Sequence, residues 1–223
     1  MNSLPSQILN IVGNFQDHMI HESHYWKTEL IKLSKKLTKR IPYKRFWTDA
    51  QNGAFEKEIM IGFYIVRKLI ESQKLPNRLV STKITGRKFS NNGATVHLMN
   101  THRFYEHYDF DNGKKEKFDL RFLINQIIHS YIFLPDFNIN EENGEMTLSA
   151  IHFCSDDQRN KWIYELNLST VIELFDKIGN SHVTNSSMTF DDNKKDYRVV
   201  HGDGVIPIPK EDEEILHLFR KRK

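Results

Sequence analysis

The sequence predicts an α+β fold in which a mostly helical N-terminal part carries β-hairpins between and after its helices. Two observations lead to this prediction. Apolar residues recur at helical spacing in three long stretches, residues 7–40, 54–74 and 119–134. Asn-Gly pairs at 92–93 and 143–144 lie between strand-like runs, which is the usual short-range signal of a hairpin. Helices accompanied by separate hairpins are typical of α+β proteins.

The length of 223 residues fits one large domain with an appendage. We expect a single α+β domain over residues 1–179, with a helical core at 7–134 followed by a hairpin and a helix at 135–179. From residue 180 the composition becomes polar and rich in turn-forming residues. Residues 180–223 are therefore expected to form a polar tail, ending in a short C-terminal helix, KEDEEILHLFRKRK, with acids at its start and bases at its end.

The first two helical stretches both end at a proline. In residues 7–40 the apolar residues follow the helical period until Pro42 stops the pattern, which predicts one long helix or two helices broken near Gly13. Residues 54–74 end before Pro76 and are apolar on most sides. A helix without a broad polar face is normally buried, so we expect this second helix at the centre of the fold.

Turn signals surround the third helical stretch. The Asp-Asn-Gly run at 111–113 predicts a turn before it, Asp119 is suited to cap its first turn, and Pro135 marks its end. Before that turn, residues 79–110 are expected to form a hairpin around the Asn-Gly pair at 92–93.

The segment after Pro135 predicts another hairpin and a further helix. MTLSAIHFC and NKWIYELNL are strand-like runs joined by the polar SDDQR, and the Asn-Gly pair at 143–144 precedes the first of them. Thr170 and Glu173 have the spacing of a capping box. VIELFDKIG is therefore expected to form a short amphipathic helix that ends at Gly179.

The composition places the chain among ordinary folded proteins. Hydrophobic residues make up 39% and aromatic residues 12%, which is too much for a disordered chain, and charged residues make up 27%. The net charge of +3 is only mildly basic, below the asymmetry of a dedicated nucleic-acid binder. Cys154 is the only cysteine, so the chain can form neither an intrachain disulfide nor a thiolate zinc cage. We expect Cys154 to be buried in a strand.

The location of the protein is predicted from what the sequence lacks. No window approaches the roughly eighteen uninterrupted apolar residues of a membrane span. The N-terminus MNSLPSQILNIVGNF lacks the basic start and small-residue cleavage site of a secretory signal. We therefore expect a cytoplasmic protein without a membrane contact.

The stretch DLRFLINQIIHSYIF carries the residues with the clearest chemistry. On a helix its apolar residues form one buried stripe, and Arg121, Asn125 and His129 form a second stripe along the flank. Asn125 is placed to hydrogen-bond His129, because residues four apart are neighbours. An imidazole beside an apolar wall can move protons, and an arginine supplies a permanent charge for a phosphate. The three residues predict phosphodiester cleavage without a metal; the alternative is a core-edge histidine satisfied by a carbonyl and an arginine paired with a carboxylate.

This stretch resembles the HEPN superfamily, many of whose members are metal-independent ribonucleases of RNA processing and phage defence. The resemblance rests on a helix that bears Arg121, a polar residue and His129 before an apolar turn, within the helices up to Leu134. The segment FLINQII separates the arginine from the histidine by more than the family pattern has, and Phe122 follows Arg121 where a polar residue is typical. A relative that binds RNA without cleaving it is therefore an alternative.

The resemblance implies a role for each residue. His129 would be the general base or acid at the ribose hydroxyl, Arg121 would stabilise the charged transition state, and Asn125 would orient the histidine or the phosphate. In the family such motifs usually meet across a symmetric dimer, so the resemblance also implies a homodimer. The resemblance therefore predicts a protein that binds RNA and acts as a metal-independent endoribonuclease in stress or phage defence. The alternative hypothesis is a non-enzymatic module that binds a protein or a nucleic acid.

A basic segment is the candidate surface for nucleic acid. The densest cluster of bases, KLSKKLTKR with YKR, contains Lys35, Lys36, Lys39, Arg40, Lys44 and Arg45. Basic residues mixed with aromatic residues such as Trp47 can hold phosphates and stack a base. The alternative is that these bases form a solvated helix face.

A metal-dependent enzyme is the third reading. Asp17, His21 and His24 would lie on one helix face and have the composition of a facial metal triad. Three ligands on one helix seldom converge on one ion, however, and exposed helical histidines are the alternative. The sequence contains no dinucleotide fingerprint, Walker motif or nucleophile elbow, so we expect no cofactor.

Overall fold

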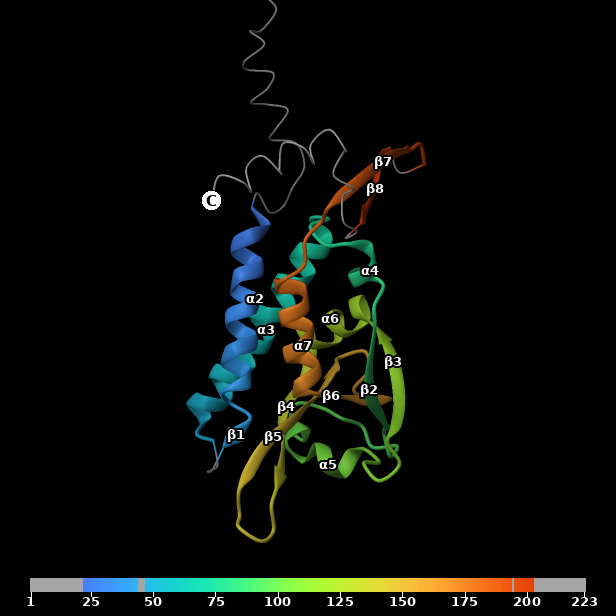
Figure 1. Cartoon of the computed structure of the whole chain (residues 1–223). Coiled ribbons are helices and arrows are strands. Elements are labelled where there is room, and N and C mark those ends of the chain that lie inside the picture. Colours follow the sequence, from blue (N-terminus) through green and yellow to red (C-terminus); the bar gives the residue numbers. More distant parts are fainter. Residues whose placement is uncertain (1–21, 44–46, 194, 203–223) are drawn as a thin grey trace, which may run out of the picture.

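The computed structural model describes residues 22–43, 47–193 and 195–202, and it confirms the α+β fold class (Figure 1). A group of helices packs against an antiparallel sheet. The helices are α2 (Ser23–Thr38), α3 (Asp49–Glu71), α4 (Asn77–Val80), α5 (Phe104–His107), α6 (Leu120–Ile128) and α7 (Leu168–Gly179). The strands are β1 (Pro42–Tyr43), β2 (Lys83–Ser90), β3 (Lys114–Asp119), β4 (Ser130–Ile139), β5 (Met146–Ser155), β6 (Trp162–Asn167), β7 (Asn185–Asp191) and β8 (Asp196–Gly202).

The central helix is α3, as its apolar sequence predicts. It starts at a capping box, in which the Thr48 hydroxyl accepts from the Gln51 N–H and the Gln51 side chain accepts from the Thr48 N–H. It contacts α2, α6, α7 and β4. Figure 1 shows α2, α3 and α7 side by side. The close approach of α3 to α7 depends on Gly62, because a Cβ there would lie 2.2 Å from the ring of Phe175.

The main sheet has the strand order β4-β5-β6-β2-β3, all antiparallel, and β1 pairs with the start of β5. Successive residues of β5 point to opposite faces. Phe153 and its partner Tyr164 form the face on which α6 packs, since Phe122 of α6 meets Tyr164 edge-on. His152 lies on the other face, against Phe110 of the segment that joins β2 to β3.

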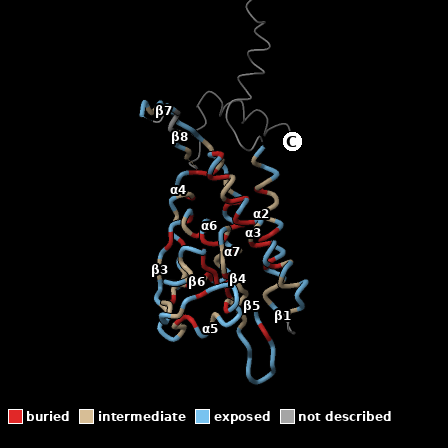
Figure 2. Tube along the Cα trace, turned by 180° about the vertical axis from the view of Figure 1, so that it is seen from behind, coloured by how far each residue is buried: buried red, intermediate tan, exposed pale blue. Residues whose placement is uncertain are grey.

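Two hairpins extend beyond the core, β4–β5 and β7–β8. Figure 2 shows the buried residues where the helices meet the sheet, while the β7–β8 hairpin and the tip of the β4–β5 hairpin are exposed. The turn at 143–144 between β4 and β5 confirms the Asn-Gly prediction, with Gly144 at φ 67°. The strands predicted in MTLSAIHFC and NKWIYELNL are confirmed as β5 and β6.

The third predicted helix, 119–134, is too long. Helix α6 ends at Ile128, His129 donates its N–H to the Asn125 carbonyl, and β4 begins at Ser130. The β-branched and aromatic residues after His129 pair with β5, and this sheet pairing outweighs the helical period. Pro135 lies inside β4 instead of after a helix. This is possible because, among the strands that the structure describes, β4 pairs with β5 alone and so forms an edge of the sheet.

Three further local predictions are wrong. No hairpin forms around 92–93; β2 ends at Ser90 and pairs instead with β6 and with β3, which follows the confirmed turn at 111–113. Thr170 caps nothing, because α7 already begins at Leu168 with Asn167 as its N-cap. Part of the segment predicted as a polar tail forms the β7–β8 hairpin.

Some predictions cannot be compared with the structure. The stretch 7–21 of the first predicted helix and the predicted C-terminal helix lie outside the described residues. In the part of the chain that is described, no helix is long and apolar enough to cross a membrane.

Candidate functional site

Helix α6 carries the predicted polar stripe on its exposed side, but one polar residue, Gln126, is buried, and its Oε1 accepts from the Ser155 N–H at 3.1 Å. Leu123 and Ile127 are fully buried, whereas Arg121, Asn125 and His129 are all exposed. Although His129 lies just past the helix end, its N–H still bonds the Asn125 carbonyl, which continues the helical path by one residue. The predicted stripe of three polar residues therefore exists on the surface of α6.

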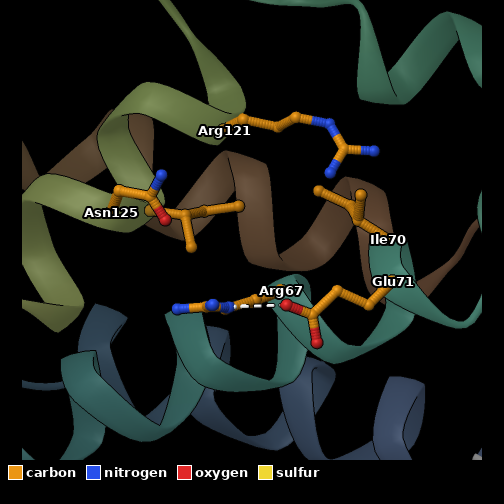
Figure 3. A pocket seen from close by; sticks show the side chains of 6 residues that line it. Arg67, Ile70, Glu71, Arg121 and Asn125 are labelled. Carbon is orange, nitrogen blue, oxygen red and sulfur yellow. Dashed lines mark hydrogen bonds and ion pairs between the residues drawn. The ribbon is translucent and has the colours of Figure 1, made fainter. Parts of the chain in front are cut away.

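A pocket of about 180 Å³ lies between α6 and α3. Arg121 and Asn125 reach it from α6, while Arg67 and Glu71 reach it from α3 on the opposite side (Figure 3). Its apolar wall is formed by Ile70 and Ile124. His129 does not line this pocket but lies beside it, next to Arg67.

Arg67 connects the pocket to His129. Its Nε donates to Glu71 Oε1 at 2.7 Å, and its Nη1 lies 3.4 Å from Nε2 of His129. Lys68 Nζ also contacts Glu71, at 3.1 Å from Oε2. The hydrogen bond from Arg67, with a smaller contribution from Lys68, lowers the pKa of Glu71 although burial opposes the shift. Glu71 is thus a carboxylate at neutral pH that holds the Arg67 side chain in place.

Arg121 has a different environment from Arg67. Among the residues that the structure describes, its guanidinium makes no hydrogen bond and no ion pair, and neither does the side-chain amide of Asn125. A guanidinium offers five N–H donors. The pocket therefore has two arginines for one carboxylate, and the charge of Arg121 is not neutralised by any described neighbour.

The interaction expected between Asn125 and His129 involves only the backbone. The Asn125 side chain does not contact the imidazole; Arg67 does. Sequence patterns do not single out Arg67, because the apolar composition of residues 54–74 predicts a buried helix. A signal existed in that helix: Arg67 and Glu71 are spaced four apart, as in an i,i+4 ion pair on an exposed face.

Some bases of the basic segment form ion pairs with a buried carboxylate, and others are exposed. Arg40 donates to both carboxylate oxygens of Glu58, at 2.6 and 2.7 Å, and Lys36 lies 2.8 Å from Glu58 Oε1. Glu58 is only 5% exposed, so these contacts hold a buried carboxylate. Lys35 and Lys39 are exposed on α2. Lys44 and Arg45 lie outside the described residues.

Trp47, one of the aromatic residues expected to stack a base together with Tyr43 and Phe46, packs into the protein instead. Its ring meets Phe55 and Phe137 edge-on at centroid distances of 5.1 Å, and the Arg40 guanidinium lies 5.6 Å from its ring centroid. Arg40, Glu58 and Trp47 thus form one structural cluster. In the described part of this segment, Lys35 and Lys39 are exposed bases outside that cluster.

The remaining candidates do not form a site in the part of the chain described here. His24 is exposed on α2, and its ring contacts Tyr25; Asp17 and His21 lie outside the described residues. No group of three potential metal ligands occurs among residues 22–43, 47–193 and 195–202. Cys154 is fully buried, as predicted, and burial raises the pKa of its thiol to about 11. A thiol in this state is a poor nucleophile.

Comparison with family models, with curated proteins and with solved structures gives no match.

Proposed function

We propose that this chain is an RNA-binding protein that holds a backbone phosphate between Arg67 and Arg121. The observation that carries the proposal is a small open pocket with two arginines from different helices, one of which has no described counter-ion. Guanidinium groups bind phosphate oxygens through paired hydrogen bonds, so arginines on two sides of a pocket suit a phosphate. Asn125 adds an amide donor on the same wall.

His129 extends the proposal from binding to metal-independent cleavage. Its contact with Arg67 is long for an N–H···N hydrogen bond, and a phosphate can therefore replace it. A phosphate that draws Arg67 away leaves Nε2 of His129 able to take the proton of a ribose 2′-hydroxyl. The 2′-oxygen then bonds to phosphorus, the bond from phosphorus to the 5′-oxygen breaks, and the 5′-oxygen takes a proton from water. The products carry a 2′,3′-cyclic phosphate and a 5′-hydroxyl.

The HEPN-like reading is part of this proposal. It treats α2, α3 and α6 as the helices of the bundle that carries the motif, and it assigns the protein to stress or phage defence. It also implies a homodimer, in which the partner copy supplies the second set of Arg121 and His129. Cleavage by one copy and cleavage by a dimer are distinguished by the dependence of the rate on protein concentration.

Binding of RNA tests the phosphate pocket. A fluorescent single-stranded RNA is titrated with the wild-type protein and with Arg67→Gln and Arg121→Gln, and its anisotropy is recorded. Each substitution removes charge-assisted hydrogen bonds to a phosphate, so we expect affinity to fall by about tenfold or more. Arg103→Gln is the matched control, because Arg103 is an exposed arginine outside the pocket. Equal affinity of all four proteins, or no binding by the wild type, contradicts the proposal.

A further inference from the structure

A second pocket, of about 430 Å³, lies where the start of α2, the end of α3 and the β7–β8 hairpin meet. Its volume is within the range of small-molecule sites. The polar side chains that line it include Lys27, Lys74, His182, Ser186 and His201, and no carboxylate is among the lining residues. It is distinct from the arginine pocket, which faces α6.

Lys27 contributes a buried ammonium group to this pocket. The residue is only 8% exposed, and its Nζ donates to the Ser181 carbonyl at 2.9 Å. An ammonium has three N–H donors, so this bond leaves others to face the pocket. Burial, together with the nearby charge of Lys74, lowers the pKa of Lys27. Among the described residues neither lysine forms an ion pair, and an anion in the pocket would supply the missing negative charge.

The backbone at the pocket wall contains an unusual residue. Gln73 has φ 54°, and it ends α3 in a position where glycine is preferred. Its N–H bonds the Ile70 carbonyl, and the next N–H, of Lys74, bonds the Leu69 carbonyl. A left-handed backbone conformation is unfavourable for a residue with a side chain. Gln73 in this place puts an amide, which glycine lacks, on the wall of the pocket.

A hydrogen bond joins the hairpin side of the pocket to the body: the His201 N–H donates to Asn77 Oδ1 at 2.7 Å. Within the hairpin, His201 Nδ1 lies 2.7 Å from the Ser186 hydroxyl. The same wall carries apolar side chains, Met188 and Val199. A ligand here would touch helix α2, the end of α3 and the hairpin at once.

We propose that this pocket binds a small phosphomonoester, with its phosphate at Lys27 and Lys74 and its uncharged part against Met188 and Val199. A pocket that pairs two lysines with an apolar wall suits a molecule with one anionic end, of about the size of a mononucleotide. By bridging the body and the hairpin, the bound molecule also holds β7 and β8 in place.

Calorimetric titration of the full chain with inorganic phosphate and with adenosine monophosphate tests this site. We expect both to bind, the nucleotide more tightly, and Lys74→Met to weaken both by about tenfold or more. Lys32→Met is the control, since Lys32 lies on α2 with an exposed side chain paired to Glu29. No binding by the wild type, or equal binding by Lys74→Met, overturns the proposal.

Two additional measurements separate this site from the arginine pocket. Arg121→Gln should keep the part of nucleotide binding that Lys74→Met removes, so loss of that part in Arg121→Gln would place the nucleotide in the arginine pocket. Hydrogen exchange of the β7–β8 backbone amides should slow when the nucleotide is present in the wild type but not in Lys74→Met. If an RNA oligonucleotide without terminal phosphate displaces the nucleotide, the site belongs to RNA and the assignment to a small molecule is wrong.

Discussion

Nη1 of Arg67, on α3, lies 3.4 Å from Nε2 of His129, the residue that follows α6. This contact brings together two segments that are far apart in the sequence. It gives His129 a cationic neighbour in place of the Asn125 amide expected from helical spacing. It also connects the histidine to the pocket that Arg121 lines.

Replacing Arg121 should change the salt dependence of RNA binding without changing stability. Its side chain is exposed and has no described partner, so Arg121→Gln should alter the free energy of unfolding by no more than about 0.5 kcal/mol. Loss of one phosphate contact should reduce the slope of log affinity against log salt by about one. Denaturant unfolding and anisotropy at several salt concentrations measure the two effects. An unchanged slope would show that Arg121 makes no phosphate contact.

The buried pair of Arg40 and Glu58 should matter to stability in a way that depends on which partner is removed. Arg40→Met leaves the Glu58 carboxylate buried with only the Lys36 ammonium beside it, and should destabilise the protein by about 3 kcal/mol. Adding Glu58→Leu removes the unpaired charge and should restore most of that loss. Urea unfolding of both variants measures this. If the double variant is as unstable as the single one, the loss comes from packing around Trp47 instead of from the charge.

Acid should destabilise the protein through Glu58. Burial opposes ionisation of this carboxyl, but hydrogen bonds from Arg40 and Lys36 outweigh it and hold its pKa below the ordinary value of 4.5. The unfolded chain therefore binds this proton more readily, so the stabilisation is complete above about pH 5 and is lost as pH falls through the folded pKa. Thermal unfolding between about pH 7 and pH 3 should show a falling Tm below about pH 5. Glu58→Gln should show a shallower fall, and an identical pH profile would contradict this assignment.

Gly62 should be intolerant of a methyl group. Alanine is the better helix former, by about 1 kcal/mol in an exposed helix. In α3, however, the added Cβ would collide with the Phe175 ring, and overpacking of this kind costs about 1–3 kcal/mol. Gly62→Ala should therefore lower the free energy of unfolding, and Gly53→Ala, in the same helix with no atom within 4 Å of the added Cβ, should not. Equal stability of the two variants would show that α7 can shift without cost.

The sequence predicts the helices and the later strands because each depends on local periodicity. α3, β5 and β6 lie close to where the apolar pattern places them. The predicted third helix is longer than α6 because the helical spacing of polar residues continues through His129. The residues after His129 instead pair with β5. That choice between helix and strand depends on a partner distant in the sequence, which periodicity does not reveal.

The candidate site was predicted only in part for a similar reason. Arg121 and Asn125 follow from the spacing on one helix. Arg67 enters through the packing of α3 on α6, and its ion pair with Glu71 did not by itself indicate which helix it would face. Conversely, the sequence predicts Lys36 and Arg40 as surface bases. Both contact the buried carboxylate of Glu58, and these contacts depend on the packing of the first helical segment against α3, which sequence patterns do not reveal.

The most direct test of the central claim is cleavage of single-stranded RNA by the purified full chain in the presence of EDTA. Wild type is compared with His129→Asn, and with His102→Asn as a control for an exposed histidine away from the pocket. We expect wild type and His102→Asn to produce fragments with 2′,3′-cyclic phosphate and 5′-hydroxyl ends, and His129→Asn to bind RNA but leave it intact. Cleavage by His129→Asn at the wild-type rate, or RNA that is bound but uncut by all three proteins, would contradict the role assigned to His129.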